Sequence, residues 1–151
     1  MTKKLFFIFS FFIFLSSCGY TPMYSSANKK KINIQVLNYE GDSQINSRIL
    51  SRLKIHNDIS SELYEIIINT DYKKTDLSKN LAGEIQSYQL KAVTKFEISG
   101  NKFKKNFEII EVFTMQNFTD DFKEMNYEKK IKNNIGNAIY QKLIIQLTKL
   151  K

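Results

Sequence analysis

The sequence has few of the residues on which enzyme and metal chemistry depend. Its 151 residues include one histidine, one cysteine and five glycines that stand apart from one another. The single histidine, His56, excludes a histidine-based metal cluster, and isolated glycines exclude a glycine-rich phosphate loop and a nucleophile elbow. One cysteine forms no disulfide within the chain, so stability has to come from a packed core. These absences predict a non-catalytic protein that holds no metal and no cofactor.

Two polar features remain as weak candidates for chemistry. His56 stands beside Asn57 at the end of a predicted helix, where a histidine is more often solvated than a ligand. Asp120, Asp121 and Glu124 could act as paired carboxylates in acid–base catalysis. They fall in a polar segment before the last predicted helix, and we interpret them as exposed loop residues.

The single cysteine follows a long apolar run. Lys3 and Lys4 precede the run LFFIFSFFIFL, Leu5 to Leu15, and two serines follow it. A charged start, a short apolar segment and a small-residue cleavage site indicate a secretory signal peptide. About 11 residues at ~1.5 Å each cover about half of a ~30 Å hydrocarbon core, which is too short for a permanent span. We therefore predict that residues 1–17 are removed.

The order Leu15-Ser16-Ser17-Cys18 resembles the lipobox of bacterial lipoproteins. In that motif the cysteine thiol receives a diacylglyceryl group, and the new amino terminus is acylated after cleavage. The alternative, a buried cysteine that acts as a small apolar side chain, is common elsewhere but leaves the position behind the signal segment unexplained. Two or more acyl chains anchor a protein stably to a membrane. Cys18 is therefore the predicted lipidation site.

The rest of the chain has the length of one domain and an excess of basic residues. The full sequence carries 23 basic and 15 acidic side chains, and two of the lysines leave with the signal segment. An exported lipoprotein rarely meets nucleic acid, whereas anionic lipid head groups and phosphorylated sugars surround it. We expect residues 18–28 to form a lipidated tether and residues 29–151 to form one domain that binds no nucleic acid.

Hydrophobic periodicity predicts the element order β-α-β-β-β-α. The predicted strands cover residues 31–36, 63–70, 82–96 and 103–116, a break follows at 39–43, and a hairpin turn is expected at 99–102. One helix is capped at Asp42 or Ser43 and ends near His56, and a second follows the polar segment 117–126. Each helix has one apolar stripe, so both can cover one face of a four-stranded, mainly antiparallel sheet in an α+β fold.

The last strand and the last helix have apolar patterns that predict further contacts. The last strand has an apolar residue on both faces, with Phe107, Ile109 and Phe113 on one side and Ile110 and Val112 on the other. This pattern indicates that part of the hairpin contacts more than the core of its own domain. The last helix carries the stripe Ile131, Ile135, Ala138, Ile139, Leu143 and Leu147, and Gly136 within it favours close packing against a neighbour.

Two groups of lysines are candidates for contact with anionic groups. Lys29-Lys30-Lys31 follows the tether and would rest on anionic head groups. Lys102, Lys104 and Lys105 lie beside the predicted hairpin tip, where they are available to a phosphorylated ligand. The alternative for both groups is an ordinary solvated lysine face. Lys104 and Lys105 point to opposite sides of a regular strand, so the three do not share one site.

The stretch from Cys18 to Tyr24, CGYTPMY, resembles the CGF-x-PLY start of the LPS-assembly lipoproteins, the LptE family. Tyr20 stands for the phenylalanine and Met23 for the leucine, and both exchanges preserve an aromatic and a large apolar side chain. Gly19 follows the cysteine where lipoproteins held at the inner membrane carry aspartate. This resembles lipoproteins that are sorted to the outer membrane.

The resemblance implies a specific non-catalytic role. Members of this family plug the barrel of the outer-membrane protein LptD, help it to assemble and bind lipopolysaccharide. It implies an anchor on the periplasmic face of the outer membrane, and Lys102, Lys104 and Lys105 become the candidate lipopolysaccharide-binding residues. The alternative is a lipoprotein that pilots or braces another envelope machine without binding lipopolysaccharide.

Overall fold

A computed structural model describes residues 33–55, 63–101 and 103–149. Several sequence predictions fall outside these ranges and stay predictions: the signal segment 1–17, the tether 18–28 with Cys18, the lysines 29–31, His56 and Lys102.

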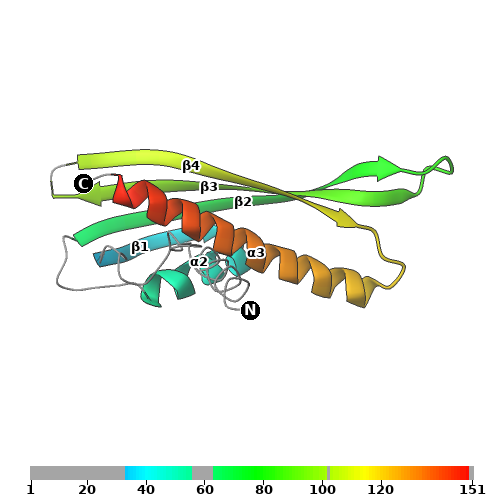
Figure 1. Ribbon diagram of the computed structural model, residues 1–151, viewed down its shortest axis with the longest axis horizontal. Coiled ribbons are helices and arrows are strands. Elements are labelled where there is room, and N and C mark those ends of the chain that lie inside the picture. Colours follow the sequence, from blue (N-terminus) through cyan, green and yellow to red (C-terminus); the bar gives the residue numbers. More distant parts are fainter. Residues whose placement is uncertain (1–32, 56–62, 102, 150–151) are drawn as a thin grey trace, which may run out of the picture. The chain divides into compact units, whose positions relative to one another are not determined.

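The described residues form two layers, a four-stranded sheet and two helices (Figure 1). β1 is parallel to β2, whereas β2, β3 and β4 are successive antiparallel neighbours. In chain order the elements are β1 (Asn33–Gly41), α2 (Ser43–Ile55), β2 (Leu63–Lys79), β3 (Ile85–Gly100), β4 (Phe103–Gln116) and α3 (Asp121–Thr148). The predicted α+β fold, with the order β-α-β-β-β-α and a mainly antiparallel sheet, is confirmed.

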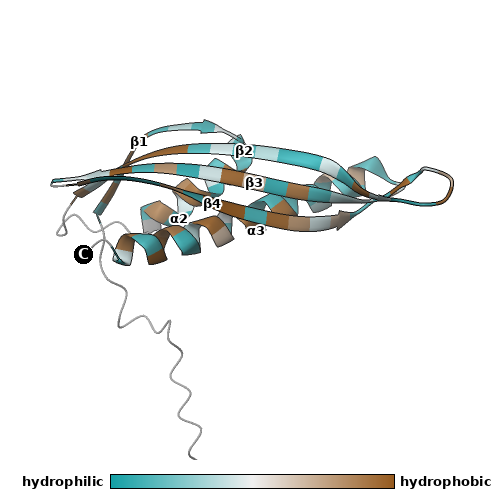
Figure 2. Cartoon of the chain, turned by 90° about the horizontal axis from the view of Figure 1, so that it is seen from above, coloured by the Kyte–Doolittle hydropathy of each residue, from teal (hydrophilic) through white to brown (hydrophobic). Residues whose placement is uncertain are grey.

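Both helices cover the same face of the sheet, and the core lies between the two layers (Figure 2). Alternate residues of the central strands enter it, since Ile66 pairs with Ile98 and Ile68 with Phe96, and all four are buried. Each such side chain contributes ~1.5–3 kcal/mol when it leaves water. The helices supply Ile45, Ile49, Leu53, Ile131, Ile135, Ile139, Leu143 and Leu147.

A glycine ends β1 later than predicted. The polar residues from Tyr39 onward predicted a break, but β1 continues alongside β2 to Gly41, with Leu37 as an extra residue in the register. Gly41 has a φ of 90°, and a Cβ there would overlap the carbonyl oxygen of Thr70. The tight turn into α2 therefore requires glycine.

The start of α2 agrees with the prediction. The Asp42 carboxylate Oδ1 accepts hydrogen bonds from the backbone N–H groups of Gln44 and Ile45, at 3.1 and 2.9 Å. These bonds satisfy two of the donors that a helix leaves free at its N-terminus.

β2 and α3 are both longer than predicted. The polar run after Thr70 predicted the end of the second strand, but β2 continues to Lys79 because its backbone pairs with β3 over the added length. Asp120 caps α3 by accepting two backbone hydrogen bonds, at 3.0 and 3.1 Å. The assignment of Asp120, Asp121 and Glu124 to a loop is therefore wrong. They form the cap and first turn of α3, where carboxylates favour the helix dipole.

The two helices meet closely at Gly136, as predicted. Gly136 is buried, and a Cβ added there would lie 2.8 Å from Cβ of Arg48 and 3.1 Å from the backbone oxygen of Ile45. Arg48 Nε then donates a hydrogen bond of 2.8 Å to Asn137 Oδ1, one residue further along α3. The glycine allows α2 and α3 to share one face of the sheet.

Candidate functional site

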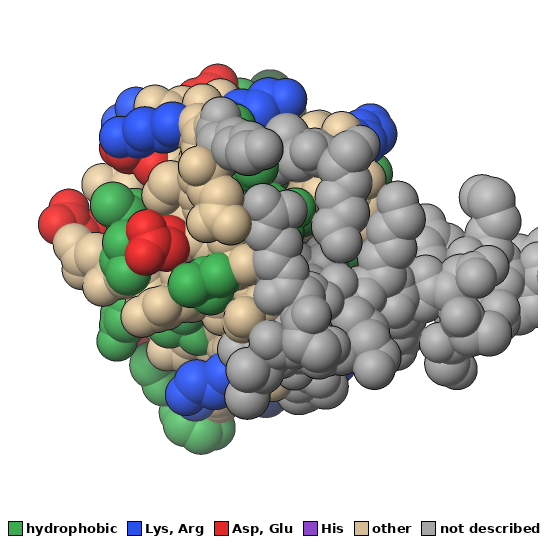
Figure 3. Space-filling model, turned by 90° about the vertical axis from the view of Figure 1, so that its left-hand side faces the viewer, with side chains coloured by type: hydrophobic (Ala, Val, Ile, Leu, Met, Phe, Trp, Pro, Cys, Tyr) green, Lys and Arg blue, Asp and Glu red, His purple; other side chains and the backbone are tan. Residues whose placement is uncertain are grey.

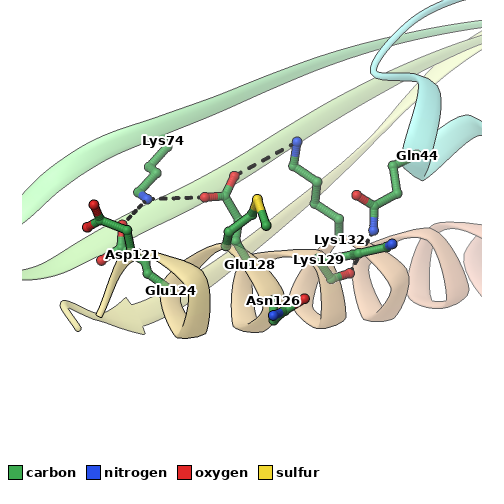
Figure 4. Close-up of a pocket in the computed structure, with 9 residues that line it drawn as sticks. Gln44, Lys74, Asp121, Glu124, Asn126, Glu128, Lys129 and Lys132 are labelled. Atoms are coloured by element: carbon green, nitrogen blue, oxygen red, sulfur yellow. Dashed lines mark hydrogen bonds and ion pairs between the residues drawn. The ribbon is translucent and has the colours of Figure 1, made fainter. Parts of the chain in front are cut away.

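The helix layer and the sheet separate at the end of the domain where α3 begins. None of residues 121–130 is buried, and the apolar stripe of α3 starts at Ile131. Between this part of α3 and β2 lies an open cleft of about 540 Å³ (Figure 4). Its lining is mostly charged and consists of Gln44, Lys74, Asp121, Glu124, Met125, Asn126, Glu128, Lys129 and Lys132.

Alternating charges cross this cleft and hold α3 to the sheet. Lys74 Nζ on β2 lies 2.7 Å from Glu124 Oε1 and 3.1 Å from Glu128 Oε2, both on α3. Lys132 Nζ lies 3.8 Å from Glu128 Oε1 and 2.8 Å from Oδ2 of Asp42, the cap of α2. These five side chains, called the ion chain below, join β2 to α3 and α3 to the start of α2.

Aromatic rings of the sheet support the ion chain. Tyr72 donates a hydrogen bond of 2.8 Å from its hydroxyl to Glu128 Oε1. Lys132 Nζ lies 4.0 Å from the centre of the Tyr72 ring, and Lys74 Nζ lies 4.2 Å from the centre of the Tyr88 ring. Both cations therefore combine a carboxylate partner with an aromatic face.

Lys74 and Glu124 keep each other charged. Burial alone would lower the pKa of Lys74, but hydrogen bonds to Glu124 and Glu128 outweigh it and raise that pKa. The hydrogen bond from Lys74 lowers the pKa of Glu124. Burial and the hydrogen bond to Glu128 raise the pKa of Tyr72 far above its ordinary value, so its hydroxyl stays a donor.

The charges of the ion chain are paired with one another. Within the ion chain each cation faces a carboxylate at close range, so no strong excess of one sign is offered to a ligand. Across residues 33–55, 63–101 and 103–149, no group of three or more His, Cys, Asp and Glu residues could hold a metal ion. No helix in the described part of the chain is long and apolar enough to cross a membrane.

The β2–β3 hairpin tip lies at the same end and carries apolar side chains on an ordered turn. Asn80 closes the turn: its backbone N–H donates to the Glu84 carbonyl at 2.9 Å, and its side-chain Oδ1 accepts from the backbone N–H groups of Ala82 and Glu84. Leu81 at the tip is fully exposed, and Leu77 is about half exposed. No apolar pattern in the sequence indicates an exposed hairpin tip here, although Asn80 and Gly83 are residue types typical of a turn.

A second exposed apolar area lies on the face of the sheet opposite the helices. Ile110 pairs with Val93 across β3 and β4, and Val112 lies two residues further along β4. Ile110 is 44% and Val112 50% exposed. The predicted division of β4 into two apolar faces is confirmed, because Ile109 and Met115 on the other face are buried.

The predicted lysines lie at the other end of the sheet. Lys104 pairs with Ser99 and Lys105 with Ile98, next to the β3–β4 turn, and neither lines the cleft. Both are exposed, and as neighbours on β4 they point to opposite faces, as expected. Lys104 Nζ lies 3.4 Å from Glu97 Oε2. Their role as lipopolysaccharide ligands stays a prediction.

The fold and site define a two-layer α+β domain with apolar side chains exposed at a hairpin tip and on the open face of the sheet. Solved structures of lipoproteins share this fold. Rare lipoprotein B from Shewanella oneidensis matches with a TM-score of 0.57 at 14% identity, covering 77% of this chain and 98% of that chain. Lipoprotein B from Nitrosomonas europaea matches with a TM-score of 0.52 at 12% identity, covering 77% and 82%.

A minor lipoprotein from Acinetobacter baumannii matches with a TM-score of 0.50 at 12% identity, covering 74% of this chain and 93% of that chain. No family model matches the sequence, and no curated protein matches it. At these identities the likeness shows the fold.

Proposed function

We propose that the chain is a non-catalytic lipoprotein, anchored through Cys18 to the periplasmic face of the outer membrane. In this role it plugs and helps to assemble an LptD-type β-barrel and takes part in lipopolysaccharide transport. One observation carries the proposal: a domain whose fold is shared with nearly the whole of rare lipoprotein B follows a start that resembles the LPS-assembly lipoproteins.

The geometry supports a role as a plug. A plug needs a body that keeps its shape and apolar side chains that a partner can cover, since exposed apolar patches mark interaction sites. The ion chain fixes the start of α3 to the sheet at 2.7–3.1 Å contacts around Lys74. Leu81 at the hairpin tip and Ile110 and Val112 on the open face of the sheet offer the apolar contacts.

Depletion of the protein from its own cells tests the assembly role. We expect the folded form of the large barrel protein, seen on semi-native gels, to fall and surface lipopolysaccharide to fall with it. An unchanged barrel would contradict the proposal. If another envelope complex lost its correct location instead, the protein would be a pilot or bracing lipoprotein that does not bind lipopolysaccharide.

Binding of purified lipopolysaccharide tests the ligand prediction separately. If lysines among Lys102, Lys104 and Lys105 bind the ligand, replacing all three with serine weakens binding while the thermal unfolding curve stays the same. The matched control replaces Lys73, Lys79 and Lys123, which are exposed in other parts of the domain. Equal affinities would remove the first three lysines from the ligand site.

A further inference from the structure

The two ends of the domain differ in charge. The end where β1 begins also contains the β3–β4 turn, since Asn33 pairs with Leu63 and the nearby Glu65 pairs with Ser99. Both helices finish toward this end (Figure 1). Its described basic side chains are Arg52, Lys54, Lys95, Lys104, Lys105, Lys142 and Lys149, and they outnumber its carboxylates, Glu65, Glu97, Glu108 and Glu111, the last of which pairs with Lys142 at 2.7 Å. At the opposite end the carboxylates of β2, the hairpin tip and the first turns of α3 balance the lysines.

Four of these lysines, Lys54, Lys104, Lys105 and Lys149, are called the basic end below. All four are exposed, and they come from the last turn of α2, from β4 and from the residue that caps α3. The contact of Lys104 with Glu97 leaves its side chain 69% exposed, so the cation remains open to solvent. Viewed from this side, lysine and arginine side chains lie around the face, with some acidic side chains among them (Figure 3).

The chain that carries the predicted anchor enters the domain at this same end, where β1 begins. The strand β3 has 16 residues, which corresponds to ~50 Å at ~3.3 Å per residue. Cys18 and Asn33 are about 15 residues apart, a distance that spans at most ~50 Å when fully extended. The chain enters the domain at the start of β1, so the membrane surface that holds an acylated Cys18 lies within easy reach of the basic end. The chain between Cys18 and Asn33 would have to be fully extended for that surface to reach the hairpin tip.

We propose that the basic end rests on the anionic phospholipid surface in which the acylated Cys18 is anchored. The inference rests on the lipid anchor of the proposed function and assigns Lys104 and Lys105 to phospholipid head groups instead of lipopolysaccharide. Anionic head groups attract each nearby lysine with ~1 kcal/mol, within a distance of ~8–10 Å at physiological salt. The contact sets which end of the domain faces the head groups, and the β2–β3 hairpin tip with Leu81 lies at the other end of the sheet.

Lysine acylation on membranes tests this orientation. The full-length, lipidated protein is reconstituted in vesicles of phosphatidylcholine alone, in vesicles that also contain phosphatidylglycerol, and in phosphatidylcholine vesicles with added lipopolysaccharide. An amine-reactive ester then labels exposed lysines, and mass spectrometry measures each labelling rate. Lys79 and Lys123, which are exposed at the opposite end, serve as internal controls in the same molecule.

We expect labelling of the basic end to slow roughly fivefold in phosphatidylglycerol vesicles, which corresponds to ~1 kcal/mol per lysine, and to recover at high salt. Lys79 and Lys123 should label at the same rate in all vesicles. Equal rates at both ends would overturn the inference, and so would slowing that requires lipopolysaccharide. Neither result bears on the proposed function. The mass of the acylated Cys18 peptide and co-purification with a barrel test that function independently.

Discussion

Gly136 of α3 and Arg48 of α2 are so close that a Cβ on the glycine would stand 2.8 Å from the Cβ of the arginine. A backbone atom, the carbonyl oxygen of Ile45, would be 3.1 Å away on the same side. Neither the Cβ nor the backbone oxygen can move without shifting α2 itself. The packing of the two helices on one face of the sheet therefore depends on the absence of one methyl group.

Gly136→Ala should destabilise the domain. Alanine favours a helix by up to ~1 kcal/mol over glycine, but overpacking a close contact costs ~1–3 kcal/mol. We expect a net loss of about 1 kcal/mol or more in the free energy of urea unfolding. Asn134→Ala, at an exposed position of the same helix, is the control and should be neutral or stabilising. A Gly136→Ala variant more stable than the wild type would contradict the close contact.

The parts of the fold that follow a simple period could be predicted from the sequence. The stripe of α3 from Ile131 to Leu147, the turn after Ser99 and the two faces of β4 agree with the structure because burial alone sets their pattern. Gly136 could be predicted because a glycine inside an apolar stripe has few other uses.

The candidate site could not be predicted in the same way. β2 continues past Thr70 because pairing with β3 overrides its polar composition. Lys74 and Glu124 come together across 50 positions of sequence, and no local pattern indicates such a pair. The polar composition of its segment instead predicts a loop for Glu124. The sequence shows that Lys104 and Lys105 stand close together, but only the strand register shows at which end of the sheet they lie.

A buried hydroxyl on β2 links three elements and should be sensitive to substitution. Thr70 Oγ1 donates to Asn46 Oδ1 of α2 at 2.7 Å and lies 3.0 Å from Thr94 Oγ1 of β3. Thr70→Val keeps the shape but leaves the partners without this hydroxyl, which should cost ~1–3 kcal/mol. Thr75→Val, exposed on the same strand, should change the thermal midpoint little. Equal midpoints for the two variants would show that the hydroxyl is dispensable.

The ion pair of Lys74 and Glu124 should make stability depend on pH. The pKa of Glu124 is lowered from 4.5 in the folded state, so the unfolded state binds a proton more readily. Its contribution is therefore complete above the unfolded pKa and is lost as the pH falls through the folded one. We expect Glu124→Gln to lower the free energy of unfolding by ~0.5–1.5 kcal/mol at neutral pH.

This difference between wild type and Glu124→Gln should shrink in acid, where both side chains are neutral. Urea unfolding at neutral and at acidic pH measures it. Asp121→Asn removes a carboxylate from the same helical turn but not from the ion chain, and it serves as the control for the helix dipole. A difference that stays constant across the pH range would rule out the pair as its source.

If the proposed barrel partner contacts the hairpin tip, Leu81→Ser should weaken its binding without lowering the stability of the domain. The side chain is fully exposed, so its loss removes no internal contact, and the turn is held by Asn80 and Glu84. We expect an unchanged thermal midpoint and less co-purified barrel. Ala82→Ser, the next residue of the same turn, is the matched control and should retain the barrel. Equal recovery with both variants would remove the hairpin tip from the interface.

The most direct measurement of the proposed role is a mild-detergent purification of the tagged full-length protein from the membranes of its own cells. Mass spectrometry then identifies the bound proteins and the N-terminal peptide. We predict a large β-barrel protein as a stable partner and a triacylated Cys18 at the amino terminus. A lipidated Cys18 that brings down a different envelope complex and no barrel would contradict the plug and leave a pilot lipoprotein in its place.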